Sequence, residues 1–161
     1  MVEIRRIKGI KPRYEVSDRL GNLSTWEGRF AREGVAADID GERWEVRREG
    51  GKRFVLNAGD RQLATADRGK RNRWTIVAGD QQYELRRKGF WGTAMELRTD
   101  SLALGSVRRA RRPRRVVCEG LDGLPAPTQA FVGFVAMALW DRDAAVAGAT
   151  AAGGGAVAAG S

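Results

Sequence analysis

The sequence predicts an all-β fold: an antiparallel barrel of about twelve strands that encloses one hydrophobic helix near its carboxyl end. Three observations favour this fold. Residues 14 to 119 alternate between apolar and polar side chains in short runs. Glycine and aspartate separate these runs at intervals too short for crossover helices, which favours antiparallel pairing. Residues 130 to 140 then form an uninterrupted apolar stretch, long enough for a buried helix.

The composition limits the chemistry that the chain can perform. Its 161 residues are 42% hydrophobic, which is enough for one ordinary domain with one core. Histidine is absent and cysteine occurs once, which excludes histidine-based triads, histidine-ligated metals and disulfides within the chain. No G-x-S-x-G, phosphate-loop or dinucleotide-binding motif is present. We therefore expect a protein that is not an enzyme, with no catalytic residue, metal or cofactor.

The predicted strands share a period of two, which is typical of strands with one buried face. We expect eleven or twelve of them, five to eight residues long, arranged as a meander. The clearest buried pairs are Trp44 and Val46, Phe54 and Leu56, Trp74 and Ile76, Tyr83 and Leu85, and Met95 and Leu97.

The predicted turns contain the residues that short hairpins require. Asp40-Gly41, Gly50-Gly51, Gly59-Asp60 and Gly79-Asp80 each separate two alternating runs. Glycine and aspartate adopt the positive φ angles of tight hairpin turns at low cost. The carboxylates of residues 38 to 42 are therefore interpreted as part of a hairpin and not as a calcium loop.

The apolar stretch predicts a helix from about residue 127 to 141, because proline fits the first helical turn at Pro127 and polar residues begin at Asp141. On a helical wheel no face is polar, so protein or lipid must enclose the helix. A twelve-stranded barrel is too wide to fill with its own side chains, and a central helix fills it. The core residues expected on this helix are Phe131, Val132, Phe134, Val135, Met137, Leu139 and Trp140.

Two other environments for this helix stay open. One is an ordinary helix packed on a sheet, and the other is a membrane anchor. The apolar stretch is short for a transmembrane span, which needs about twenty residues, so we expect no such span. We expect one domain over residues 1–144, followed by a disordered alanine- and glycine-rich tail over residues 145–161.

The net charge of +9 favours an anionic partner. The densest cluster is Arg108 to Arg115, which we expect in a loop or at a strand edge because Pro113 interrupts it. Guanidinium groups bind phosphate in a bidentate way. A second cluster places cations beside Phe90 and Trp91. The candidate anion- or lipid-binding residues are Arg86, Arg87, Lys88, Arg108, Arg109, Arg111, Arg112, Arg114 and Arg115. The alternative is a solvated basic surface.

The meander from Tyr14 to Glu119, the closing helix from Phe131 to Trp140, and the stretch from Tyr83 to Gly92 together resemble the tubby C-terminal-like superfamily. That group includes the LURP-one-related proteins and the phospholipid scramblases. The resemblance implies a twelve-stranded barrel around a hydrophobic helix, and contact with lipid or membrane. The chain lacks the cysteine-rich stretch and the acidic calcium loop of scramblases, so the resemblance does not imply scramblase activity.

These observations predict a domain that binds anionic ligands, with phospholipid head groups at a membrane surface as the leading hypothesis. Nucleic-acid binding through Arg108 to Arg115 is the first alternative, and a structural or regulatory protein-binding module is the second. Residues 1 to 11 lack the apolar segment of a signal peptide. We therefore expect a cytoplasmic location, peripheral to a membrane if the lipid hypothesis is right. A buried structural thiol is expected at Cys118.

Overall fold

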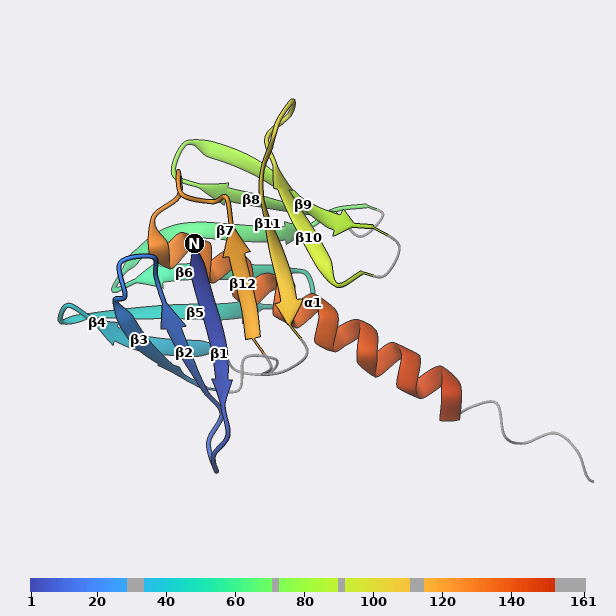
Figure 1. Cartoon of the computed structure of the whole chain (residues 1–161), viewed down its shortest axis with the longest axis horizontal. Helices are drawn as coiled ribbons and strands as arrows, with labels where there is room; N and C mark the ends of the chain where they lie inside the picture. The colour runs from blue at the N-terminus through green and yellow to red at the C-terminus, as the bar shows by residue number, and fades with distance from the viewer. Residues whose placement is uncertain (29–33, 71–72, 90–91, 111–114, 153–161) are drawn as a thin grey trace, which may run out of the picture.

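The computed structural model describes residues 1–28, 34–70, 73–89, 92–110 and 115–152. Twelve antiparallel strands form a closed barrel, and a single helix follows them (Figure 1). The predicted fold class is therefore confirmed. The strands are β1 (Val2–Ile7), β2 (Arg13–Ser17), β3 (Leu23–Glu27), β4 (Val35–Ile39), β5 (Glu42–Glu49), β6 (Arg53–Ala58), β7 (Arg61–Arg68), β8 (Trp74–Ala78), β9 (Gln81–Lys88), β10 (Ala94–Arg98), β11 (Ala103–Ala110) and β12 (Arg115–Glu119). The helix is α1 (Ala126–Ala152).

The barrel is a meander in which each strand pairs with the next along the chain, and β1 pairs with β12 to close the cylinder. Val2 lies opposite Cys118, and Ile4 lies opposite Val116. The strand β1 lies before the range in which strands were predicted. Its two adjacent arginines break the apolar alternation after Ile4, and this hides the strand in the sequence.

Three hairpins have the two-residue turns that the sequence predicts, at residues 40–41, 59–60 and 79–80. Asp40 has a φ of 51° and Gly41 a φ of 79°, so both central residues of that turn are left-handed. Gly59 and Gly79, with φ angles of 56° and 58°, take the left-handed position in the other two turns. A residue without a Cβ relieves the steric cost of this conformation.

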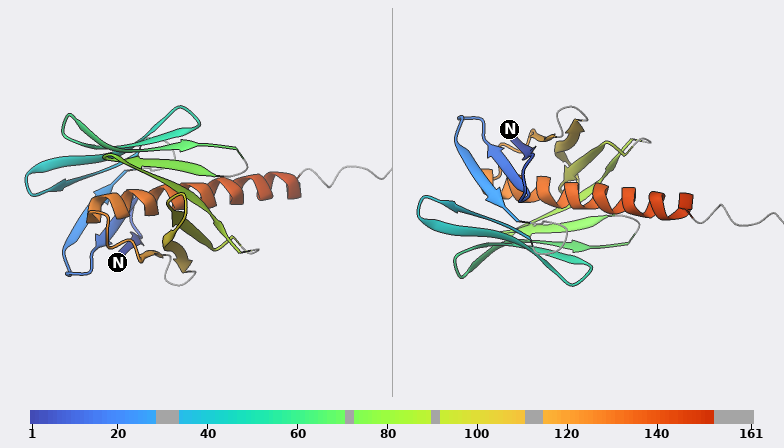
Figure 2. Two further views of the ribbon diagram at one scale, coloured as in Figure 1. Left: turned by 90° about the horizontal axis from the view of Figure 1, so that it is seen from above. Right: turned by 90° about the horizontal axis from the view of Figure 1, so that it is seen from below.

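The helix α1 runs through the barrel between opposite walls (Figure 2). Phe131, Val132, Phe134 and Val135 are fully buried, Trp140 is buried, and Met137 and Leu139 are partly buried. The ring of Phe134 lies 5.5 Å from Tyr14 and 5.4 Å from Trp26, measured between centroids. These contacts pack α1 against strands β2 and β3.

A glycine allows α1 to approach the seam where the barrel closes. A Cβ atom on Gly133 would lie 2.7 Å from the Ile4 side chain on β1 and 3.0 Å from the Cys118 sulfur on β12. Because neither contact is sterically tolerable without movement, Gly133 permits this close packing of helix on sheet.

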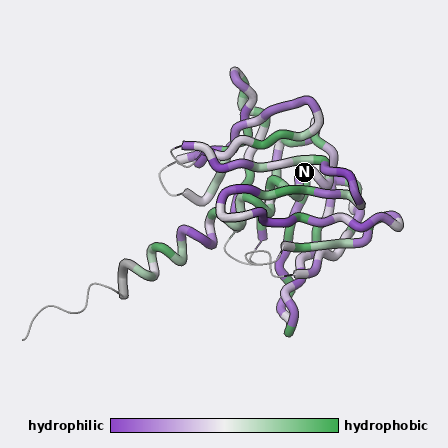
Figure 3. Tube along the Cα trace, turned by 180° about the vertical axis from the view of Figure 1, so that it is seen from behind, coloured by the Kyte–Doolittle hydropathy of each residue, from purple (hydrophilic) through white to green (hydrophobic). Residues whose placement is uncertain are grey.

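The helix is longer than predicted. The predicted end was near residue 141, with a disordered tail from residue 145, but α1 continues to Ala152. The polar turn of residues 141–143 marks where α1 leaves the barrel (Figure 3), and the alanines that follow have the highest helix propensity. The rest of the predicted tail, residues 153–161, lies outside the described residues. Within the described ranges, no helix has the length and hydropathy needed to cross a bilayer.

Candidate functional site: the helix-exit end of the barrel

The helix α1 projects from one end of the barrel and not from the other. We call the end where α1 leaves the barrel the exit end, and the other, which carries the three two-residue turns, the hairpin end. Because the strands alternate in direction, the odd-numbered strands finish at the exit end. The last residues of these strands therefore surround α1 as it emerges (Figure 1).

Five odd-numbered strands finish with an arginine on their inward face. Side chains two residues apart on a strand point to the same face. Each of these arginines follows by two residues an inward core residue that is 0% or 1% exposed. The core residues are Ile4, Val46, Ala66, Leu85 and Val107, and the arginines that follow them are Arg6, Arg48, Arg68, Arg87 and Arg109. We call these five residues the arginine collar.

The strand register supports the inward orientation of the arginine collar. Residues directly opposite each other in an antiparallel pair lie on the same face of the sheet. Each collar arginine lies opposite a buried residue of the following strand. The pairs are Arg6 with Tyr14, Arg48 with Phe54, Arg68 with Trp74, Arg87 with Met95, and Arg109 with Val116. The collar is therefore the last inward layer of the barrel, between the apolar core and solvent.

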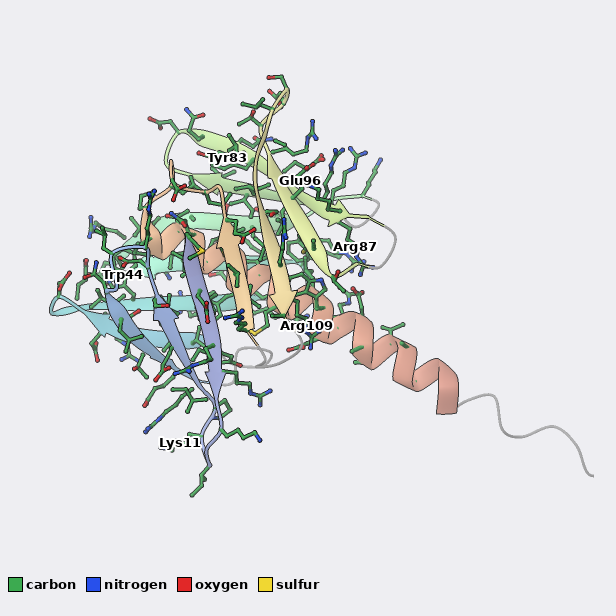
Figure 4. The ribbon with its side chains drawn as sticks, in the orientation of Figure 1. Lys11, Trp44, Tyr83, Arg87, Glu96 and Arg109 are labelled. Atoms are coloured by element: carbon green, nitrogen blue, oxygen red, sulfur yellow. The ribbon has the colours of Figure 1, made fainter. Side chains whose placement is uncertain are left out.

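The emerging turn of α1 supplies two counter-charges to the arginine collar. Asp143 forms an ion pair with Arg87, and Asp141 Oδ1 lies 3.9 Å from Arg109 Nη2. Both arginines lie beside α1 at the point where it leaves the barrel (Figure 4). Arg142, on the same turn, adds a sixth cation. Six cations therefore surround two carboxylates, and the exit end keeps an excess of positive charge.

The pKa of Tyr14 reports on the same region. Burial raises the pKa of its hydroxyl, the charge of Arg6 lowers it, and the charge of Asp141 raises it again. Both charges are therefore close to a phenol that packs against Phe134 in the core. This agrees with an Arg6 side chain on the inward face of β1, opposite Tyr14.

A backbone contact fixes α1 to the rim. The indole Nε1 of Trp140 donates a hydrogen bond of 2.6 Å to the carbonyl of Gly92, between β9 and β10. Gly92 has a φ of 63°, a conformation that favours glycine. Trp140 thus holds the helix against the same hairpin that carries Arg87.

The predicted cations on β9 divide between two faces. Arg87 faces α1, whereas Arg86 and Lys88 face outward and lie 3.3 Å and 3.6 Å from the carboxylate of Glu96. Arg98 contacts the same carboxylate at 3.0 Å. The hydrogen bond that Arg98 donates is the largest cause that lowers the pKa of Glu96, and the hydrogen bond from Arg86 lowers this pKa further. Arg86 and Lys88 therefore share a counter-ion on the barrel wall.

The predicted cluster from Arg108 to Arg115 is also divided. Arg108 and Arg109 belong to β11 and Arg115 begins β12, so three of its arginines are on strands and not in a loop. Arg108 lies 3.4 Å from Glu119, and Arg115 lies 3.5 Å from Glu3. Arg111, Arg112 and Arg114 lie outside the described residues. Only Arg109 of the described members joins the arginine collar.

A cleft opens beside the arginine collar, between the β5–β6 turn and α1. Its volume is about 520 Å³, within the range of small-molecule sites. Arg48, Lys52, Arg68 and Arg142 line it together with Phe54, Trp74 and Leu139. The cleft therefore combines cations with an apolar wall.

Lysine and aspartate are divided between the connections at the two ends, although Arg19 also lies in a connection at the hairpin end. Lys8, Lys11, Lys52 and Lys70 lie in connections at the exit end, and Lys88 is the last residue of β9; these are all the lysines of the chain. Aspartate occupies each connection at the hairpin end, at residues 18, 40, 60, 80, 100 and 122. The amino terminus, at the same end, pairs with Asp122 at 2.9 Å. The barrel is electrically polarised along its axis.

Two minor candidates have structural roles. The residues around Asp40 form the β4–β5 hairpin, as predicted. Cys118 is buried, and burial raises the pKa of its thiol to about 12, so the thiolate that a nucleophile requires is strongly disfavoured. In the part of the chain that the structure describes, no group of three metal-binding side chains occurs.

No local pattern in the sequence marks the arginine collar as a unit. The phase of each of these arginines, two residues after a core residue, already places it on the inward face. The available signal was the recurrence of arginine two residues after the last core position in five strands. That signal becomes specific only when a closed barrel brings the five strand ends together.

Comparisons with known protein families, with curated proteins and with solved structures found no match. The resemblance to the tubby C-terminal-like superfamily therefore stays a prediction.

Proposed function

We propose that the exit end binds anionic phospholipid head groups at a membrane surface, without catalysing a reaction on them. The observation that carries this proposal is the arginine collar. Asp143 and Asp141 pair with Arg87 and Arg109, whereas Arg6, Arg68 and the adjacent Arg142 form no ion pair in the described chain. Guanidinium groups bind phosphate oxygens through paired hydrogen bonds, so a ring of them matches a layer of phosphate groups.

The polarity of the barrel supports a single orientation on the surface. Near an anionic membrane each basic side chain contributes about 1 kcal/mol of attraction, and the attraction falls within a Debye length of about 10 Å. A strand of eight residues spans about 26 Å, so the aspartates at the hairpin end lie beyond that range when the exit end faces the membrane. The opposite orientation would place these carboxylates against the lipid phosphates.

The projecting part of α1 is compatible with this orientation. After Asp143, residues 144 to 152 carry no charged side chain. A helix satisfies its own backbone hydrogen bonds, and the main cost of placing it among lipid head groups comes from charged side chains. The projecting segment therefore does not oppose the approach of the collar to the surface.

Flotation with vesicles tests the proposal. The full chain is mixed with phosphatidylcholine vesicles with or without phosphatidylserine, and the fraction that floats is measured. We expect capture by the anionic vesicles alone. Replacing Arg6, Arg48 and Arg68 by Gln removes about 3 kcal/mol of attraction, which is roughly a hundredfold in partitioning.

A matched control separates position from net charge. Arg19, Arg43 and Arg61 lie in or beside connections at the hairpin end, and replacing them by Gln removes the same charge. We expect this variant to float nearly as well as the unmodified chain. Equal losses of vesicle capture in the two triple variants would show that binding depends on net charge and not on the exit end. If the unmodified chain is not captured by anionic vesicles, the proposal is wrong.

Nucleic-acid binding remains the second proposal, because the same cations could contact a phosphate backbone. The outward cations that would follow such a backbone, Arg108 and Arg115, form ion pairs with Glu119 and Glu3. A gel shift at two salt concentrations tests it, since each phosphate contact steepens the salt dependence. A strong, salt-dependent shift without vesicle capture would favour nucleic acid over lipid.

A further inference from the structure

The cleft beside α1 has an uneven charge. Four cations line it, Arg48, Lys52, Arg68 and Arg142, against one carboxylate, that of Asp141. Asp141 lies 3.9 Å from Arg109, which is not among the residues that line the cleft. Lys52, Arg68 and Arg142 form no ion pair within the described chain. Among the described residues, these three cations of the cleft therefore lack a counter-ion.

The side chain of Arg48 is hydrogen-bonded to the turn at the mouth of the cleft. Its Nε donates a hydrogen bond of 3.1 Å to the carbonyl of Gly50 in the β5–β6 turn. This contact joins the turn to the end of β5. Lys52 follows two residues later, so the turn presents its ammonium group beside the Arg48 side chain.

The other wall of the cleft is apolar. Phe54 and Trp74 lie at its floor with their ring centroids 5.5 Å apart. Ala138 and Leu139 of α1 are half-buried and face them, and Ala145 extends this wall along the projecting helix. Phe54 and Trp74 are only 4% and 3% exposed, so the apolar surface that is still open on this wall belongs to Ala138, Leu139 and Ala145. A small inorganic anion would leave that surface in contact with water. A ligand with an alkyl chain would cover it.

We propose that this cleft binds one anionic amphiphile with a single alkyl chain. Its carboxylate or phosphate lies among Lys52, Arg68 and Arg142, and its chain lies along Leu139 and Ala145 over the two aromatic rings. The inference rests on the proposed function, since the same collar supplies the charge. The proposed function concerns the attraction of the exit end to a charged surface. The inference goes further and assigns one bound molecule to a defined site.

Calorimetric titration of the full chain tests the ligand class. The probes are dodecanoate, dodecyl phosphate and dodecyltrimethylammonium, each below its micelle concentration, and acetate. We expect saturable binding of the two anionic amphiphiles with one molecule per chain. Acetate should bind at least about tenfold more weakly, because it lacks the chain, and the cationic amphiphile should not bind. Equal binding of the cationic amphiphile, or no binding of either anionic one, overturns the inference.

A pair of substitutions on α1 tests the location. Ala145 lines the cleft, whereas Ala149, one helical turn further, is not among its lining residues, and both side chains are exposed. Ala145→Glu places a carboxylate in the cleft and should weaken dodecanoate binding at least about tenfold, as should Arg68→Gln. Ala149→Glu, with the same charge and the same helix, should leave it unchanged. Equal affinities of the two alanine variants overturn the assignment to this cleft.

The two proposals can fail separately. If anionic vesicles capture the chain but dodecanoate does not bind, the surface proposal stands and the cleft proposal is wrong. If dodecanoate binds and vesicles do not capture the chain, the cleft holds a soluble amphiphile and the membrane proposal is wrong. The relative affinities of dodecanoate and dodecyl phosphate distinguish the two sources of the anion. Tighter binding of dodecanoate favours a fatty carboxylate, and tighter binding of dodecyl phosphate favours a single-chain phospholipid.

Discussion

The same strands build both ends of the barrel, yet the two ends differ in charge and in the reason for it. At the hairpin end, three connections have only two residues, and Asp40 itself adopts a left-handed φ of 51°. Aspartate is among the few residues that tolerate this conformation. At the exit end the connections are longer, and no turn geometry calls for arginine two residues after the last core position.

This difference separates a charge that turn geometry explains from one that it does not explain. Turn geometry explains Asp40, which adopts a left-handed φ, and Asp18, which accepts hydrogen bonds from the backbone of its own turn, so neither aspartate needs a ligand. The arginine collar crowds like charges around α1, which costs electrostatic energy in the isolated protein. The fold does not require the arginine collar, and like charges held close together repel each other. The collar is therefore a stronger indication of a binding site than the aspartates are.

The largest expected effect tests whether the two ends belong to one filled cylinder. Replacing the fully buried Phe134 by Ala should lower the free energy of unfolding by about 3–5 kcal/mol, because it removes contacts with Tyr14 and Trp26 and leaves a cavity. Urea unfolding followed by circular dichroism measures this. The control is Val146→Ala on the projecting part of α1, which should cost less than about 0.5 kcal/mol. Equal costs would contradict a helix enclosed by the barrel.

The next prediction tests the explanation given for the hairpin end. Asp40→Ala should destabilise the protein by about 1 kcal/mol, since alanine is strained at the left-handed φ that Asp40 adopts. Asp60→Ala should cost less, because the left-handed residue of its turn is Gly59. Thermal unfolding of both variants provides the comparison. If both cost the same, turn geometry does not account for the aspartates at this end.

A smaller effect concerns the counter-charges at the exit end. Asp143→Asn removes the ion pair with Arg87, which is partly exposed and therefore worth less than about 1 kcal/mol. We expect faster amide hydrogen exchange in α1 beyond residue 143, mainly at low salt. Arg142→Gln, on the same turn but without an ion pair in the described chain, serves as the control. Unchanged exchange in the Asp143 variant would show that the pair does not hold the emerging helix.

The smallest expected effect is the sharpest test of the comparison. Replacing Asp60, Asp80 and Asp100 by Asn raises the net charge of +9 by three. If orientation governs binding, vesicle capture should change by less than about twofold, because these residues lie beyond the Debye length from the surface. A large gain in capture would show that net charge alone controls binding.

The regular features of the fold could be predicted from the sequence, because local patterns determine them. The period of two identifies strands, and aspartate with glycine identifies two-residue turns. The helix was recognised because its apolar stretch has no polar face. Its end at Ala152 was not, since the polar residues around Asp141 mark an exit from the barrel and do not end the helix.

The candidate site could be predicted only in part. Arg87 and Arg109 were named from local charge clusters, but their partners Asp143 and Asp141 are distant in sequence. Arg6, Arg48 and Arg68 stood outside any cluster, and only barrel closure brings them to one rim. Charge density along the chain therefore selected Arg108 and Arg115, which the structure pairs with carboxylates on the outer wall.

The position of α1 after all twelve strands has a consequence for biosynthesis. A nascent chain that has reached only Glu119 has made every strand, but the apolar side chains that α1 covers have nothing to pack against. Long-range pairing of β1 with β12 is slow even when it is favourable. The ribosome must release residues beyond Trp140 before the polypeptide can reach its native state. Until then we expect chaperones to shield it from aggregation.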